Sequence, residues 1–230
     1  MAAQPSSSGG GRSDPISRYP VVARPLLARM AARHAPTYQH QGRVSRIAEA
    51  FATDLRLSRR EVRMVSLSAL LHDIGKLEIP GAVLTKAGPL TPEEVELVCE
   101  HPARGAAILA RYPALAHLAV VVRHHHEWFD GRGYPDGLKG EEIPWLSRLI
   151  AICDAFDCMT TPRPYAPPLS VEQALDEIRR GAGTQFDPEL ARHFLERHRR
   201  VLVVHPRYPT EWTDPEQRPR PLAVRARGRT

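Results

Sequence analysis

The stretch from Ser58 to Lys76 reads SRREVRMVSLSALLHDIGK and predicts a core helix that ends in polar residues. Ser58 and Glu61 have the spacing of a capping box, in which each side chain accepts a hydrogen bond from the other residue's backbone N–H. Apolar residues then recur at helical spacing until His72 and Asp73 follow the run Ala-Leu-Leu. A carboxylate at the end of so apolar a helix is costly to bury unless it is paired or bound to a metal. The stretch therefore indicates a polar site in the interior.

Similar helical patterns extend over most of the chain, and capping residues, prolines and glycines mark their ends. Helices are expected from residue 21 onward and over 39–55, 58–73, 91–101, 103–111, 114–125, 145–159, 170–181 and 187–200. The segment 129–144 is rich in glycine and proline and is expected to be a loop, and 201–204 a short extended segment. No strand alternation of any length appears, so the expected fold class is all-α.

Composition indicates a globular chain rather than a membrane or secreted one. The 230 residues are 42% hydrophobic and 25% charged, values usual for folded domains. No apolar run approaches the roughly 18 residues of a membrane span, and the first residues lack the apolar core of a secretory signal. The three cysteines form no CxxC pair. We expect a disordered leader over 1–20, one domain over 21–200, an Arg/Pro-rich tail over 201–230, and a cytoplasmic location.

The net charge of +6 comes from the two ends of the chain. Residues 199–230 hold eight arginines against three acids, and residues 1–30 hold four arginines against one acid. The body between them is close to neutral, whereas a protein that reads DNA usually carries its basic stripe on a folded face. Specific nucleic-acid binding is therefore not expected.

Eleven histidines are a surplus for this length, and several stand where predicted helices end. The candidates are His72-Asp73, His101, the run His124-His125-His126-Glu127, and Asp154 in the most apolar helix. Taken singly, each has an ordinary explanation, since a histidine at a helix C-terminus often interacts with the helix dipole. Taken together, imidazole and carboxylate groups from several helices suit iron, manganese or zinc, and they argue against a structural zinc site built from cysteines.

A series of motifs resembles the HD-GYP subset of the HD phosphohydrolases over residues 21–198. In family order they are HDIGK at 72–76, LTKAGPLT at 84–91, HPxxG at 101–105, HHExxDGxGYP at 125–135, IP at 143–144, DxFDxMT at 154–160, RPY at 163–165 and GTQFDP at 183–188. HDIGK alone is moderately specific, whereas HHExxDGxGYP is very specific. The resemblance implies an HD-type multi-helix bundle with a metal centre in its core. It also implies hydrolysis of the bacterial messenger cyclic di-GMP to pGpG, and it leaves open whether pGpG is hydrolysed further to GMP.

Carried over by position, the resemblance implies two metal ions bridged by Asp73. One ion would be held by His40, His72, Asp73 and Asp154, and the other by Asp73, His101, His125 and His126. A carboxylate can bridge two cations about 3.5–4 Å apart, and such a pair activates water and draws charge from a phosphodiester. Asp73 and Lys76 are the expected catalytic residues, with Lys76 and Arg163 binding the substrate. Iron or manganese is preferred to zinc.

Two departures from the family pattern refine these expectations. Pro36 stands where some members have a glutamate that contributes to a third metal, so a third metal is not expected. Ala166 stands where many members have a basic residue, which leaves Arg163 as the main local cation. Two smaller features receive structural interpretations: His124 is expected to be a solvated neighbour of the HHE motif, and the cysteines 153 and 158 to fill the core.

The resemblance leaves three functions open. The first is the cyclic di-GMP phosphodiesterase, and the second is the same site acting on another cyclic dinucleotide. The third is a catalytically weak adaptor that binds a diguanylate cyclase (GGDEF) through the loop Gly133-Tyr134-Pro135. The complete set of apparent ligands favours an enzyme, because an adaptor needs no metals. The resemblance is compatible with a homodimer, and the oligomeric state stays open.

Overall fold

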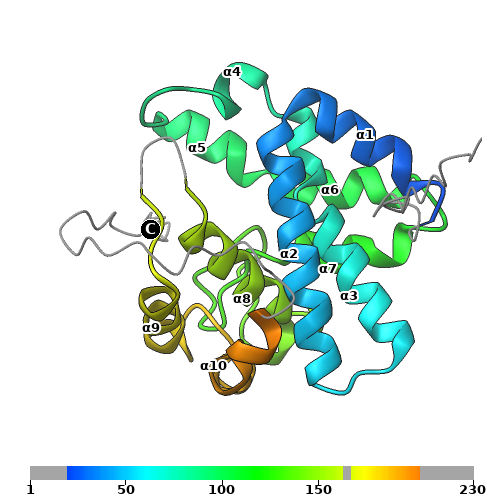
Figure 1. Cartoon of the computed structure of the whole chain (residues 1–230). Helices are drawn as coiled ribbons and strands as arrows, with labels where there is room; N and C mark the ends of the chain where they lie inside the picture. The colour runs from blue at the N-terminus through cyan, green and yellow to red at the C-terminus, as the bar shows by residue number, and fades with distance from the viewer. Residues whose placement is uncertain (1–19, 163–166, 203–230) are drawn as a thin grey trace, which may run out of the picture.

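The computed structural model describes residues 20–162 and 167–202, and this part of the chain is built from helices without strands (Figure 1). Its α-helices are α1 (Ala23–Arg33), α2 (Ala35–Asp54), α3 (Arg59–Leu71), α4 (Gly81–Leu84), α5 (Pro92–Cys99), α6 (His101–Ala110), α7 (Ala119–Arg123), α8 (Trp145–Thr160), α9 (Val171–Gly181) and α10 (Pro188–Leu202). Short 3₁₀ turns are η1 (Ile74–Glu78), η2 (Ala116–Leu118) and η3 (Gly140–Glu142). The all-α class is confirmed.

The capping signals in the sequence are confirmed at the starts of α3, α5 and α9. The capping side chain at each of these starts accepts a hydrogen bond from the backbone N–H three residues later, and the side chain of that later residue accepts one from the backbone N–H of the capping residue. The capping residues are Ser58, Thr91 and Ser170. These reciprocal bonds satisfy backbone donors that a helix start would otherwise leave unpaired. Helix α2 begins at Ala35, earlier than expected, because the His34 side chain caps it by accepting from Thr37 N.

Helix boundaries also differ from the expectations at His101 and at the C-terminal end of α10. His101 is the first residue of α6 rather than the end of the preceding helix, since Glu100 alone separates α5 from α6. Pro102 then occupies the first turn of α6, where its missing N–H costs no hydrogen bond. At the other end of the chain, Val201 continues α10 and is buried, so the expected extended segment is wrong at 201–202. Residues 203–204 lie outside the described part.

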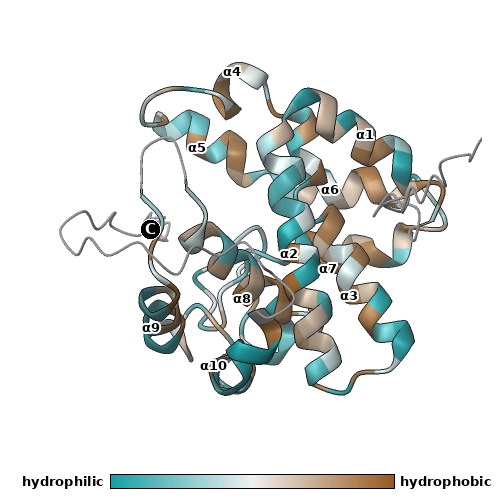
Figure 2. Cartoon of the chain, in the orientation of Figure 1, coloured by the Kyte–Doolittle hydropathy of each residue, from teal (hydrophilic) through white to brown (hydrophobic). Residues whose placement is uncertain are grey.

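Two apolar clusters form the core, and α2 packs on helices of both (Figure 1). It packs on α8 and α10 of the first cluster and on α1 and α3 of the second. The first cluster joins α2, α8, α9 and α10 around the buried rings of Phe51, Phe156 and Phe194. The second joins α1, α3 and α6. Figure 2 shows teal and brown residues interspersed along these helices, as expected for amphipathic helices that bury one face. No helix in the described part is both long and apolar enough to cross a bilayer.

A glycine contact brings η1 against α6. A Cβ atom on Gly75 would lie 1.9 Å from the carbonyl oxygen of His101 and 2.5 Å from the backbone nitrogen of Gly105. Such distances are far below van der Waals contact, so only glycine lets the two backbones approach this closely. The approach places Asp73, just before η1, beside His101 at the start of α6.

Candidate metal centre

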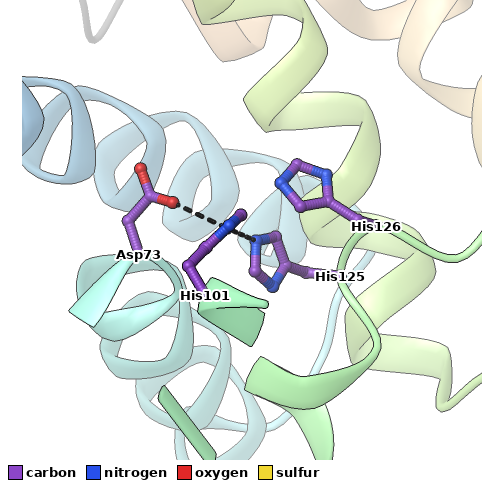
Figure 3. Close-up of side chains that lie close together, drawn as sticks. All are labelled: Asp73, His101, His125 and His126. Atoms are coloured by element: carbon purple, nitrogen blue, oxygen red, sulfur yellow. Dashed lines mark hydrogen bonds and ion pairs between the residues drawn. The ribbon is translucent and has the colours of Figure 1, made fainter. Parts of the chain in front are cut away.

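Seven side chains from five parts of the fold converge between the helices. His40 lies on α2, His72 and Asp73 follow α3, His101 begins α6, His125 and His126 follow α7, and Asp154 lies on α8. The sequence resemblance assigned these residues to metal binding, and the structure brings six of them together in two overlapping groups, while Asp154 falls in a third group with His40 and Cys158. Figure 3 shows one group, in which Asp73, His101, His125 and His126 face one another. The second group contains His40, His72 and Asp73.

Three of the histidines are oriented by the same local hydrogen bond. The Nδ1–H groups of His72, His101 and His125 donate to the carbonyl oxygens three residues earlier, at 2.7, 2.7 and 2.6 Å. A carbonyl oxygen can only accept, so these bonds place the proton on Nδ1 and leave the Nε2 lone pair for the site. Metal-binding histidines are usually held in this way by a partner on the other ring nitrogen.

The oriented lone pairs meet around the Asp73 carboxylate. His101 Nε2 lies 3.1 Å from Asp73 Oδ1 and 3.3 Å from His125 Nε2, and Figure 3 marks both contacts. Asp73 is 1% exposed, and its Oδ1 has no hydrogen-bond partner. When the rings are neutral, the Nε2 atoms of His101 and His125 and the Oδ1 atom of Asp73 bring their lone pairs together with no proton between them. These lone pairs repel one another unless a cation lies among them. The residues present therefore fit a metal ion.

The other Asp73 oxygen faces the second group. His72 Nε2 lies 3.6 Å from Asp73 Oδ2, and His40 Nε2 lies 3.9 Å from the same oxygen. Asp154 closes this group, since its Oδ1 is 2.9 Å from His40 Nε2 and 3.8 Å from His72 Nε2. The two oxygens of one buried carboxylate thus face two different sets of nitrogen ligands, which is the arrangement a bridging ligand needs.

Sequence reasoning missed the partners of His40. Its Nδ1–H donates to Asp157 Oδ2 at 2.7 Å, and the guanidinium of Arg43 binds both oxygens of Asp157 at 2.8 and 2.9 Å. Asp157 is fully buried, and a bidentate arginine is the strongest common partner for a buried carboxylate. Helical spacing was the available signal: Arg43 follows His40 by three residues, and Asp157 follows Asp154 by three.

Burial and charge set the protonation of the ligands. Burial lowers the pKa of His72, and it lowers that of His125 well below the usual range. Burial lowers the pKa of His126 to about 3, so this ring is neutral at pH 7. Burial alone would raise the pKa of Asp73, but the Lys76 ammonium and His72 hold it well below its ordinary value. At pH 7 the site therefore offers neutral imidazoles at His72, His125 and His126 and an ionised carboxylate at Asp73, which are the ligand forms of these groups.

Of the two substrate-binding candidates, the structure describes one. Lys76 lies in η1, and its Nζ donates to Asp73 Oδ2 at 2.7 Å. Burial would lower the pKa of Lys76, but the facing carboxylates, first of all that of Asp73, raise it, so the ammonium stays charged. Arg163 and Ala166 lie outside the described residues.

The loop with Gly133-Tyr134-Pro135 contacts the metal-centre group directly. The ring of Tyr134 lies 5.0 Å from that of His126, tilted by 30°. A Cβ on Gly133 would lie 2.1 Å from the backbone nitrogen of Trp128, so the chain turns here against its own backbone. Glu127 Oε1 accepts hydrogen bonds from the N–H groups of Asp136 and Gly137, which ties the loop to the end of the HHE motif.

His124 differs from the expectation of a solvated neighbour. Its side chain is buried, with one ring nitrogen 2.8 Å from the Val120 carbonyl oxygen and the other 2.8 Å from Asp136 Oδ2. Arg123 binds both oxygens of the same Asp136, and its hydrogen bond is the main reason that the pKa of Asp136 falls to about 2. The expectation was wrong because Asp136, twelve residues later, folds back over the ring.

The two cysteines of α8 have different surroundings. Cys153 is fully buried in the first apolar cluster, as expected. Cys158 is half-buried, and its Sγ lies 3.3 Å from Asp154 Oδ1. The core-filling interpretation is therefore wrong for Cys158, because the spacing of four residues places it on the same helix face as Asp154.

The sequence of this chain is similar to a known domain family and to several curated proteins. The model of the HD domain family matches residues 25–190. A "Cyclic di-GMP phosphodiesterase" of Thermotoga maritima is 38% identical over 183 residues, which cover 79% of this chain and 50% of that protein. A "3'3'-cGAMP-specific phosphodiesterase 2" of Vibrio cholerae is 34% identical over 187 residues, covering 80% of this chain and 36% of that protein. The chain thus spans half or less of the length of these curated relatives.

A solved structure gives the same assignment at the level of fold. The HD domain of the L. monocytogenes phosphodiesterase PgpH, in complex with cyclic-di-AMP, matches with a TM-score of 0.58 and 17% identity. The match covers 83% of this chain and all of that chain. Because the family model spans most of the residues and the fold agrees, the chain belongs to the HD domain family.

Proposed function

We propose that this protein is a metal-dependent phosphodiesterase that opens cyclic di-GMP to linear pGpG. The observation that carries the proposal is the contact of His101 Nε2 with Asp73 Oδ1 and His125 Nε2 in a buried site. Lone pairs that face one another in a buried site repel, so a cation is needed between them. HD domains bind divalent metals, and relatives at 38% and 34% identity are named phosphodiesterases of cyclic dinucleotides.

The two ligand groups on Asp73 support a centre of two ions without a third. Asp73 would bridge, with His40, His72 and Asp154 on one side and His101, His125 and His126 on the other. Pro36 lies in the first turn of α2 and offers no carboxylate for another ion. When bound, the ions would supply Lewis acidity to the phosphodiester and lower the pKa of a water molecule. Nitrogen and oxygen ligands at these positions favour iron or manganese.

The chain's own residues would orient the substrate and balance its charge. Lys76 sits at the edge of the centre, where its ammonium is held by Asp73. A positive group fixed at this point can neutralise a phosphate oxygen as charge develops on it, and such preorganised charge usually gives the largest catalytic effect. Arg163 would add a second cation for the other phosphate of a cyclic dinucleotide.

The test is direct hydrolysis by the full chain. The protein is reconstituted with Mn²⁺ or, anaerobically, with Fe²⁺, incubated with cyclic di-GMP, and the products are separated by chromatography. We expect pGpG, lost in Asp73→Asn and retained in Asp176→Asn, a matched change at an exposed aspartate of α9. No turnover by the metal-loaded protein would contradict the proposal. GMP at long times would show that the linear product is also a substrate.

A second candidate is hydrolysis of a mixed cyclic dinucleotide at the same site. Its support is the relative named a 3'3'-cGAMP-specific phosphodiesterase, which covers 80% of this chain. Parallel assays with cyclic di-GMP and 3'3'-cGAMP at equal concentrations distinguish the two. A kcat/KM at least tenfold higher for 3'3'-cGAMP would replace cyclic di-GMP as the preferred substrate.

The adaptor function is the alternative in which the protein binds a partner but catalyses little or no hydrolysis. It predicts that a diguanylate cyclase binds the loop Gly133-Tyr134-Pro135 whether or not metal is present. Binding that survives Asp73→Asn, together with absence of turnover, would favour the adaptor. Cytoplasmic location and a homodimer remain predictions from the sequence and are part of the same proposal.

A further inference from the structure

Cys158 places a sulfur atom at the edge of the candidate metal centre. Its Sγ lies 3.3 Å from Asp154 Oδ1, and the same oxygen lies 2.9 Å from His40 Nε2. One ligand atom from each of His40, Asp154 and Cys158 falls within 4.8 Å of the other two. Asp154 and Cys158 lie one turn apart on α8, and the packing of α2 against α8 brings His40 to them.

The surroundings of Cys158 are those of a ligand rather than of a core residue. It is half-buried, and its Sγ lies against the carboxylate of Asp154, close enough to Lys76 for an electrostatic interaction. Cys153, five residues earlier on the same helix, is buried among apolar side chains of the first cluster. One helix therefore carries one cysteine toward the core and one toward the polar centre.

The separations of these atoms agree with the edges of a coordination shell. Bonds of about 2.0–2.2 Å to nitrogen or oxygen and about 2.3 Å to sulfur, at tetrahedral angles, give ligand-to-ligand distances of about 3.4–3.6 Å. The observed 3.3 Å between Cys158 Sγ and Asp154 Oδ1 is slightly below that spacing, and the 2.9 Å between His40 Nε2 and Asp154 Oδ1 is about half an ångström below it. A half-buried thiol at this spacing can ligate after small side-chain rotations.

We propose that Cys158 is a thiolate ligand at the His40/Asp154 position, an inference that rests on the metal centre of the proposed function. When the thiol ligates, its S–H bond breaks, a sulfur–metal bond forms, and the proton leaves to solvent. The position then has a mixed nitrogen, oxygen and sulfur donor set. A soft thiolate selects zinc or iron over manganese, so Cys158 shifts the preference of this position away from manganese.

Cobalt spectroscopy tests the ligand directly. The full-length chain is stripped of metal and titrated with Co²⁺, which shows d–d bands in any such site but an intense near-ultraviolet sulfur-to-cobalt band only with a thiolate ligand. We expect this band in the unchanged protein and in Cys153→Ala, the matched control. We expect Cys158→Ser to lose it while keeping the d–d bands, because serine preserves the hydrogen bond to Asp154 without the sulfur.

Metal affinity gives a second readout. Cys158→Ser should weaken Zn²⁺ binding by at least about tenfold, and Mn²⁺ binding by less than about threefold, because a hard ion gains little from sulfur. Persistence of the charge-transfer band in Cys158→Ser, or equal losses for both ions, would overturn the inference. Co²⁺ binding with d–d bands but no sulfur band would overturn it and leave the metal centre standing. Absence of any Co²⁺ binding would overturn both.

Discussion

At the scale of single residues, the site is determined by which ring nitrogen each histidine turns inward. His72, His101 and His125 are oriented by their own helices, through carbonyl oxygens three residues earlier. His40 is oriented by Asp157, which is separated from it by 117 residues and held in turn by Arg43. The orientation of His40 therefore depends on tertiary structure.

Replacing Asp157 tests this dependence. Asp157→Asn keeps the size of the side chain but loses the charge that orders His40 and Arg43. We expect metal affinity to fall by about 10–100-fold, as is usual when the partner of a ligating histidine is lost. Calorimetric titration with Mn²⁺ measures the effect, and circular dichroism checks the helices. Asp54→Asn, which alters another arginine-paired aspartate at the end of α2, is the control, and an equal loss there would contradict the assignment.

The protonation of His40 predicts a pH effect on metal binding. Burial would lower its pKa, but hydrogen bonds to Asp154 and Asp157 raise the pKa to about 9 in the metal-free protein. The imidazolium must lose a proton before Nε2 can ligate. Metal binding at pH 7 should therefore release a proton from His40, and affinity should rise with pH until about 9. Calorimetry in buffers of different ionisation enthalpy counts the protons, and His40→Gln should release about one fewer.

At the scale of elements, the approach of η1 to α6 assembles the two sides of the centre. Gly75 meets the backbone of His101 and Gly105, and Gly105 is itself close to the backbone nitrogen of Gly75, with a Cβ there 3.2 Å away. Both ligands that face each other across this contact, Asp73 and His101, lie within two residues of it. Small residues here act through the distance between ligands rather than through any chemistry of their own.

Gly75→Ala should separate these elements. A methyl group placed 1.9 Å from a backbone oxygen cannot be accommodated without moving η1 or α6. We expect a loss of about 1–3 kcal/mol in the free energy of unfolding, the usual cost of overpacking, together with weaker metal binding. Urea denaturation of the metal-free protein measures the first effect. Gly81→Ala is the control, because nothing lies within 4 Å of its added Cβ, and it should change neither quantity appreciably.

At the scale of the whole molecule, the centre links the two apolar clusters. Asp154 comes from α8 of the first cluster, while His72 and His101 flank helices of the second. A metal ion bound to both would hold the folded state together, and it would bind the same residues more weakly in an unfolded chain, where they lie far apart. Ligand binding of that kind stabilises by mass action.

Metal removal should consequently lower the melting temperature. At a free metal concentration of 100 times Kd, one site contributes about 2.7 kcal/mol, which corresponds to roughly 5–10 °C for a chain of this size. Differential scanning calorimetry with added Mn²⁺ and with a chelator measures the shift. Asp73→Asn should remove the dependence on metal. An equal metal-dependent shift of the melting temperature in Asp73→Asn would mean that the ion stabilises the fold at a different site.

What the sequence determined by itself is local. The capping boxes at Ser58, Thr91 and Ser170 and the apolar periodicity set the helices, because these signals act within four residues of chain. The types of ligand could be predicted too, since histidine and aspartate at helix ends suggest a metal, and the motifs matched a family. His101 was placed on the wrong side of a helix boundary because Glu100 alone separates α5 from α6.

Only the tertiary structure decided which atoms meet. The partner of His40, the burial of His124 under Asp136, the approach of Gly75 to α6 and the position of Cys158 all join segments far apart in the chain or choose one face of a helix. Such contacts depend on how helices pack, and packing is set by the sum of many weak apolar contacts rather than by any short motif. Ligand identity is therefore written in the sequence, whereas ligand orientation is a property of the folded core.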